Sequence, residues 1–346
     1  MVFAICMAPI GISFATTLAG PSNSSFVIRS FEWFRDHGAA AVATKVESIY
    51  YSLNAPSTGG PALHSLPLRA GTAAAVHPQD VTPLISPSLP GEGVWAPTER
   101  WSGASPPVQI AQFRSDPNYP QMVAGVAWID PRRTSIVLYA GRLEPSVSVP
   151  RGPMEVPSSL RSRLLATFNS GFKLEDSHGG WADGGVTYAP LQRGMATFVG
   201  YTDGSVDIQS WQGGPDVPRG VVFARQNLPL IVEGGRPNPN LSDGPQWGVT
   251  VGNAIRVWRS GIGINAQGDL IYAAANDQTV SSLAAILIHA GAIRAMQLDI
   301  NSYWVTFNFY GQPGGGSPSD LLPSMTRPVT RYLAPDDRDF FAVYLR

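Results

Sequence analysis

The chain has 346 residues, of which 44% are hydrophobic and 14% are charged, and its formal net charge is −1. A chain of this length and apolar content can bury a full core, which excludes disorder throughout. The near-neutral charge and the lack of a basic run longer than Arg132-Arg133 exclude an electrostatic surface for nucleic acid. The 36 Gly and 31 Pro indicate many turns and short strands, and they argue against a helical bundle.

Residues 1–20 are predicted to form a signal-anchor or transmembrane segment, because positions 2–19 are apolar or small and uncharged. The small residues 17–19 would suit a cleavage site, whereas retention of residues 3–18 in the bilayer would make an anchor, the reading we favour. A buried core helix is the third alternative, and Pro9 and Gly11 argue against it. We therefore expect a membrane-anchored chain with an extracytoplasmic domain, or a secreted one.

Residues 21–53 are predicted to form an amphipathic helix that is interrupted at Gly38. Asn23, Ser24 and Ser25 offer N-caps, and apolar side chains recur at helical spacing from Phe31 to Ile49. This apolar stripe is expected to pack on the following domain or to rest on a membrane surface, with packing favoured.

Residues 54–107 are rich in Pro, Gly and Ser, which predicts an extended linker. Trp95, near its end, indicates that the chain returns there to the folded body.

Residues 108–346 are predicted to form one α+β domain with a strand-rich, mostly antiparallel core and few helices. The Asp130-Pro131 turn joins two alternating apolar runs in a hairpin. The clearest helix is expected over 281–290, closed by Gly291. Strands are expected at 122–129, 134–139, 164–168, 194–201, 205–211, 228–233, 247–251, 254–258, 261–265, 270–275, 295–298 and 340–344.

Three polar residues stand at the edges of apolar strand-like runs, where a side chain can point into a cleft: Asn169, Arg259 and Asp299. The order Asn-x-Gly-Phe, then Arg-x-x-Ile-Gly-Ile, then Leu-Asp, over residues 160–305, resembles the phosphodiester glycosidase family. That resemblance implies that Arg259 holds phosphate, that Asp299 does acid/base or electrostatic work, and that Asn169 orients the sugar. The family usually continues Leu-Asp with a glycine-rich loop, whereas a bulkier loop from Ile300 to Trp304 follows here.

A polar loop over residues 173–185 has the density of titratable groups expected of an active-site flap. Glu175, His178 or Asp183 could supply a second catalytic group there, and Trp181 a stacking platform for a sugar. Gly171 would let the backbone approach a ligand closely. The predicted substrate-binding residues are thus Gly171, Glu175, His178, Trp181, Asp183, Asn301 and Ser302.

No cofactor and no metal are expected. Cys6 is the single cysteine and lies in the first apolar run, the histidines lack metal-ligand spacing, and no P-loop or Gly-x-Ser-x-Gly elbow occurs.

The predicted function is that of an exported hydrolase that cleaves the glycosidic bond of a sugar phosphodiester in the cell envelope. Its partners would be that phosphodiester or an envelope glycan, and a membrane through the N-terminal segment, without nucleic acid. One alternative is a non-catalytic glycan-binding or scaffold domain, in which Tyr303 and Trp304 stack on sugars. Another is a glycosidase for a linkage without phosphate, which would need two carboxylates in one cleft and no Arg259.

Overall fold

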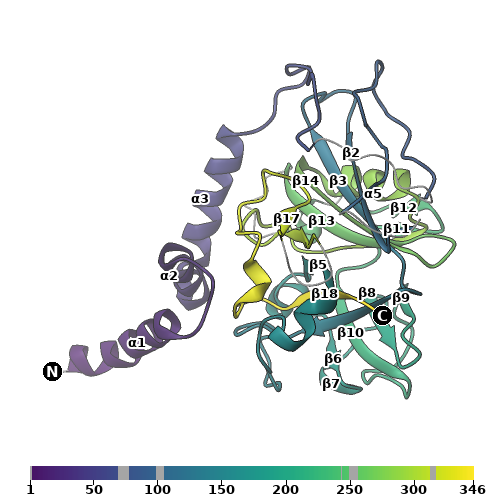
Figure 1. Ribbon diagram of the computed structural model, residues 1–346. Coiled ribbons are helices and arrows are strands. Elements are labelled where there is room, and N and C mark those ends of the chain that lie inside the picture. Colours follow the sequence, from purple (N-terminus) through teal and green to yellow (C-terminus); the bar gives the residue numbers. More distant parts are fainter. Residues whose placement is uncertain (1, 69–77, 99–104, 243, 249–255, 312–316) are drawn as a thin grey trace.

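The structure is a computed structural model in which three sheets form a body and three helices run along one side of it (Figure 1). It describes residues 2–68, 78–98, 105–242, 244–248, 256–311 and 317–346. Every strand pair among these residues is antiparallel, which confirms the strand-rich, antiparallel α+β class with few helices.

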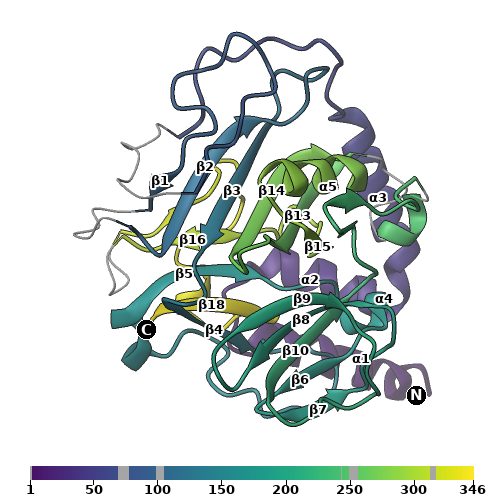
Figure 2. The ribbon, with the colours of Figure 1, turned by 90° about the vertical axis from the view of Figure 1, so that its right-hand side faces the viewer.

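The largest sheet has eight strands in the order β1-β2-β3-β14-β13-β15-β11-β12. Helix α5 (Val280–His289), capped by Thr279, packs across β13 and β14 on one face (Figure 2). Gly261 permits this contact, because a Cβ there would lie 2.9 Å from Leu287 Cδ1. The strands of this sheet are β1 (Ala96–Pro97), β2 (Val108–Arg114), β3 (Val123–Ile129), β11 (Val232–Glu233), β12 (Arg236–Pro237), β13 (Val257–Ile264), β14 (Leu270–Gln278) and β15 (Arg294–Gln297).

Two five-stranded sheets complete the body, in the orders β7-β6-β10-β8-β9 and β17-β16-β5-β18-β4. The first contains β6 (Trp181–Asp183), β7 (Val186–Ala189), β8 (Ala196–Tyr201), β9 (Val206–Ser210) and β10 (Val221–Asn227). The second contains β4 (Thr134–Tyr139), β5 (Leu164–Asn169), β16 (Phe307–Phe309), β17 (Ser319–Asp320) and β18 (Phe340–Leu345). Short helices are η2 (Ser158–Arg163), α4 (Leu174–Ser177), η3 (Gly244–Trp247) and η5 (Arg331–Leu333).

The main core joins all three sheets. Phe168 on β5, Phe198 on β8, Tyr272 on β14 and Phe341 on β18 belong to one buried cluster. The rings of Phe198 and Phe341 lie 4.8 Å apart, and those of Phe168 and Phe341 lie 5.2 Å apart. The inward face of each sheet is therefore fixed by aromatic packing at the centre of the body.

Most of the predicted strands are present, including β3, β4, β5, β8, β9, β14, β15 and β18. The separate strands expected at 254–258 and 261–265 form the single strand β13, and the one expected at 228–233 shortens to β11. Of the strand expected at 247–251, Trp247 ends the short helix η3, and 249–251 lie outside the described residues. The helix expected at 281–290 is confirmed as α5.

Residues 2–53 form the arm, which comprises α1 (Val2–Ala19), α2 (Phe26–Phe34), the π-helical turn η1 (Arg35–Ala39) and α3 (Ala40–Leu53). Ser25 caps α2 through its side chain. His37 and Gly38 have non-helical backbone angles, and the φ of 99° at Gly38 places the break where the sequence predicted it. In the described part of the chain, no helix combines the length and apolar character needed to cross a membrane. The membrane span expected within residues 1–20 therefore has no support.

The apolar stripe of the arm does not pack on the body, contrary to the favoured expectation. Phe34, Val42, Val46 and Ile49 are 50 to 65% exposed. The physical reason is that the arm turns charged groups toward the body instead, as the contacts of Glu32 show below.

The segment expected to be an extended linker lies on the large sheet where the structure describes it. Leu66, Val81 and Trp95 are buried, and β1 pairs with β2. Trp95 Nε1 donates a 3.0 Å hydrogen bond to Gln79 O. The spacing role predicted for residues 54–107 is corrected in these parts, because apolar side chains anchor them to the body.

Candidate functional site

Asn169, Ser260 and Asp299 meet at one place although they come from β5, β13 and the segment after β15. Asn169 Nδ2 donates to Ser260 Oγ (3.0 Å), and Ser260 Oγ donates to Asp299 O (2.7 Å). Asp299 N donates to Ser170 O (3.1 Å), which also accepts from Asn169 Nδ2 (2.9 Å). The backbone of Asp299 is thus held on both sides by residues that Asn169 positions.

The Asn169 side chain is fully engaged within the protein. Its Oδ1 accepts from Tyr272 Oη (2.8 Å) and from Thr306 N (3.0 Å), while Nδ2 makes the two bonds above. The residue is 2% exposed. In this conformation Asn169 organises the site, and the direct contact with a sugar expected from the sequence stays a prediction.

Arg259 lies on the opposite face of the large sheet from Ser260, since successive residues of a strand alternate in direction. Its Nε donates to Gln278 O (3.0 Å), and its Nη1 donates to Gln297 Oε1 (2.7 Å) and Trp247 O (3.2 Å). Burial lowers the pKa of Arg259 to about 10. The guanidinium is therefore separated by the sheet from Asn169 and Asp299, and its role as phosphate ligand stays a prediction.

Asp299 is paired with Arg338, a residue that the sequence reading did not select. Arg338 Nη2 donates to Asp299 Oδ2 (2.8 Å) and to Gly171 O (3.2 Å). Asn301 N donates to Asp299 Oδ1 (3.0 Å). Burial raises the pKa of Asp299, and the positive charge of Arg338 opposes that rise. A carboxyl group with a raised pKa and a fixed cation beside it has the properties of a general acid or base.

Gly171 lies at a close approach within the site. A Cβ at this position would lie 3.1 Å from Asn227 Cβ, so the glycine is needed for packing against β10. Its carbonyl holds Arg338, as described above, and no role in ligand contact follows from these contacts.

The predicted flap residues lie in different environments. Glu175 and His178 are exposed, and Glu175 lies 3.7 Å from Lys173 Nζ. Asp183, half-buried at the end of β6, has a pKa raised by burial. Trp181 is 1% exposed, and its Nε1 donates to Asp339 Oδ2 (3.2 Å). Trp181 belongs to the main core, which corrects its expected role as a stacking platform, because neither ring face is open to a ligand.

The loop after Asp299 contacts the arm. Asn301 Nδ2 donates to Glu47 Oε1 on α3 (3.4 Å), and Ser302 makes a hydrogen bond with Tyr51. Burial, together with the negative charges of Glu32 and Asp299, raises the pKa of Glu47 to about 7 against the effect of Arg35. Asn301 and Ser302 thus lie beside Asp299, as predicted, but they face the arm.

Lys173, on the body, is held by carboxylates of the arm. Its Nζ lies 2.7 Å from Asp36 Oδ1 and 3.1 Å from Glu32 Oε2. The residue is 5% exposed. Lys173 opens the polar loop that the sequence singled out, but the reading considered the acids there and not the lysine. Arg338 stands in Asp336-Asp337-Arg338-Asp339 immediately before an apolar run, so the edge signal that selected Asp299 would also have found it.

A cavity of about 110 Å³ lies beneath α2. Its walls include Glu32 and Asp36 from the arm and Lys173, Trp304 and Arg338 from the body. Among the described residues, no group of three or more His, Cys, Asp or Glu side chains could hold a metal ion.

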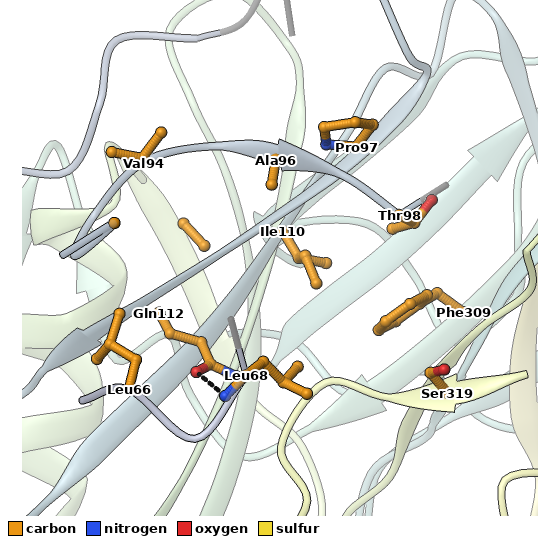
Figure 3. A pocket seen from close by; sticks show the side chains of 12 residues that line it. Leu66, Leu68, Val94, Ala96, Pro97, Thr98, Ile110, Gln112, Phe309 and Ser319 are labelled. Atoms are coloured by element: carbon orange, nitrogen blue, oxygen red, sulfur yellow. Dashed lines mark hydrogen bonds between the residues drawn. The ribbon is translucent and has the colours of Figure 1, made fainter. Parts of the chain in front are cut away.

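A larger cavity of about 270 Å³ lies between β1–β2 and β16–β17 (Figure 3). Its lining is mainly apolar, as Leu66, Ile110 and Phe309 show, and Gln112 Oε1 accepts from Leu68 N (3.2 Å). None of the described lining residues is ionisable. This cavity therefore offers no acid, base or fixed charge for hydrolysis.

No family model matches the chain, and neither does any curated protein. Solved structures do match. The catalytic domain of zebrafish N-acetylglucosamine-1-phosphodiester alpha-N-acetylglucosaminidase, auto-inhibited by its pro-peptide, is 17% identical; the match covers 73% of this chain and 87% of that one, with a TM-score of 0.45. A hypothetical protein from Synechocystis is 12% identical, with 70% and 64% covered and a TM-score of 0.36. These values describe a distant relationship of fold and carry no argument about activity.

Proposed function

We propose that the chain is a hydrolase that cleaves the glycosidic bond of a sugar phosphodiester in the cell envelope. The observation that carries the proposal is the Asp299–Arg338 pair, set where Asn169 and Ser260 converge. The order of the motifs around Asn169 and Asp299 supplies the reaction class, through the resemblance described above.

In this reaction Asp299 serves as the acid/base carboxyl group. The raised pKa allows it to hold a proton near neutral pH more readily than an exposed aspartate does. Asn169 acts as a positioning residue, because it holds the Ser170 and Ser260 groups that fix the Asp299 backbone. Arg338 stabilises the carboxylate form and restricts its orientation.

The test is product analysis after incubating the full chain with a panel of sugar 1-phosphodiesters. We expect release of free sugar and phosphomonoester, and a loss of about 100-fold or more in kcat/KM for Asp299→Asn. Asp203→Asn, on an exposed turn, is the matched control and keeps full activity. Turnover by Asp299→Asn at the wild-type rate would refute the assignment. The location outside the cytoplasm, expected from the apolar residues 2–19, is part of the proposal and is tested by cell fractionation.

A second candidate is a glycan-binding domain without turnover. It is favoured by Trp304, which lines the cavity beneath α2 and could contact a sugar ring if the arm moved. Sugar binding that depends on Trp304, with no product from any member of the panel, would support this candidate.

A further inference from the structure

Glu32 on the arm places a carboxylate among three cations at the candidate site. Glu32 Oε2 lies 3.1 Å from Lys173 Nζ, and Glu32 Oε1 lies 3.8 Å from Arg35 Nη1. Burial opposes ionisation of Glu32, but the positive charges of Lys173, Arg35 and Arg338 outweigh it and lower its pKa. The position of this carboxylate is thus one that the body makes favourable for an anion.

Two of these cations belong to the body and would remain if the arm left. Lys173 would keep only the exposed Glu175, 3.7 Å away, as a described carboxylate partner. Arg338 is 6% exposed, and its Nε–H group is buried without a hydrogen-bond partner. A buried guanidinium with an unused donor is costly unless an acceptor reaches it. Arg338 therefore has a donor available for an anion in addition to the one it gives to Asp299.

Trp304 completes this place. It lines the cavity beneath α2 with Lys173 and Arg338, and its ring lies 5.3 Å from the Arg338 guanidinium carbon. An aromatic wall beside fixed cations suits a ligand that has both a sugar ring and an anionic group.

We propose that Lys173 and Arg338 form the binding subsite for the phosphoryl group of the substrate, and that Glu32 and Asp36 of the arm occupy this subsite in the conformation described here. The choice of a phosphoryl group rests on the proposed function. The subsite adjoins Asp299, since Arg338 binds that carboxylate at 2.8 Å, so a phosphoryl group there has the acid/base carboxyl group beside it.

The arm covers the site in a way that allows its release. Its contacts near the subsite are mainly ionic, while Val42, Val46 and Ile49 stay exposed and give no apolar burial on the body. Tyr51 is the main apolar contact near Asp299, where it packs with Phe172 and Ile300. Loss of the carboxylates at Lys173 should therefore weaken docking without disturbing the core of the body.

The experiment measures binding of inorganic phosphate to the full chain by titration calorimetry. The variant Glu32→Gln/Asp36→Asn removes the two arm charges and keeps the side-chain shapes. We expect it to bind phosphate at least about 10-fold more tightly than the wild type, because the apparent dissociation constant falls as the open fraction rises. Adding Lys173→Met to this variant should reverse the gain, and Lys173→Arg should retain it. Glu175→Gln, which removes an exposed carboxylate near the same lysine, is the matched control and leaves the open fraction unchanged.

Two results would overturn the proposal: phosphate affinity that does not change in the Glu32→Gln/Asp36→Asn variant, or a gain in affinity that survives Lys173→Met. Thermal unfolding of each variant confirms that it is folded. Turnover of sugar 1-phosphodiesters is assayed in parallel. Phosphate binding of the expected pattern without turnover would support the subsite and refute the hydrolase. Turnover that is insensitive to Lys173→Met would refute the subsite alone.

Discussion

Replacing Arg259 by Met tests whether this residue is structural, as its position on the outer face of the large sheet indicates. Arg259 is 4% exposed and donates to Gln278 O, Trp247 O and Gln297 Oε1. Hydrogen bonds from a charged donor contribute about 1.5–3 kcal/mol each, so their loss costs roughly 4–9 kcal/mol. The fall of the Arg259 pKa from 12.5 to about 10 corresponds to about 3 kcal/mol of burial cost that the variant recovers. The net expectation is a loss of roughly 3 kcal/mol in the free energy of unfolding.

The assay is urea unfolding followed by tryptophan fluorescence, with KM measured on protein that is still folded. Arg256→Met, close by in the chain, is the control. Its Asp116 partner lies 3.6 Å away and both side chains are about one-fifth exposed, so a loss below about 1 kcal/mol is expected. If Arg259→Met kept wild-type stability and raised KM by about 100-fold, Arg259 would contact substrate and the reasoning from strand alternation would be wrong.

Three further outcomes are expected. Gly261→Ala should lower the free energy of unfolding by about 1–3 kcal/mol in urea titrations, because a Cβ there meets Leu287 of α5; unchanged stability would show that α5 can shift freely. Burial raises the pKa of Asp320 to about 7; the folded state therefore binds an extra proton between about pH 4 and 7, and stability falls as pH rises through that window. Asp320→Asn should flatten that fall, by about 1 kcal/mol after solvent screening, and equal slopes for both proteins would contradict this. Glu47, which faces Arg35, Glu32 and Asp299, has a pKa raised to about 7 in the docked arm, so docking should weaken several-fold between pH 5 and 7. Amide exchange of α3, corrected for intrinsic rates, should show this in the wild type and lose it in Glu47→Gln; the same slope in both would exclude Glu47 as the cause.

The strands that were predicted well are those in which apolar residues alternate or run together, such as β3 and β18. Those that were missed carry buried polar residues. Arg225 and Gln226 on β10 are 1% and 0% exposed, and both are satisfied by hydrogen bonds. Such residues look like loop in the sequence, because their partners lie far along the chain and a periodic pattern does not reveal them.

The candidate site was predicted in part. A carboxylate after an apolar run is costly to bury without a partner, and this reasoning selected Asp299. The identity of that partner, Arg338, depends on β18 and the turn before it lying beside β5. The arm shows the same limit, since helical periodicity predicted its apolar stripe but not that Glu32 and Glu47 would face the body.

By itself, the sequence determined the antiparallel α+β class, the helix α5, the break at Gly38 and the edge positions of Asn169 and Asp299. These follow from local periodicity, backbone sterics and the cost of burying a charge, all of which act within a few residues. Only the tertiary structure decided that Arg259 and Ser260 serve opposite faces of one sheet, that Arg338 binds Asp299, and that Glu32 lies on Lys173. The reason is that alternation along a strand assigns neighbours to opposite faces, whereas long-range pairing and packing choose what each face meets.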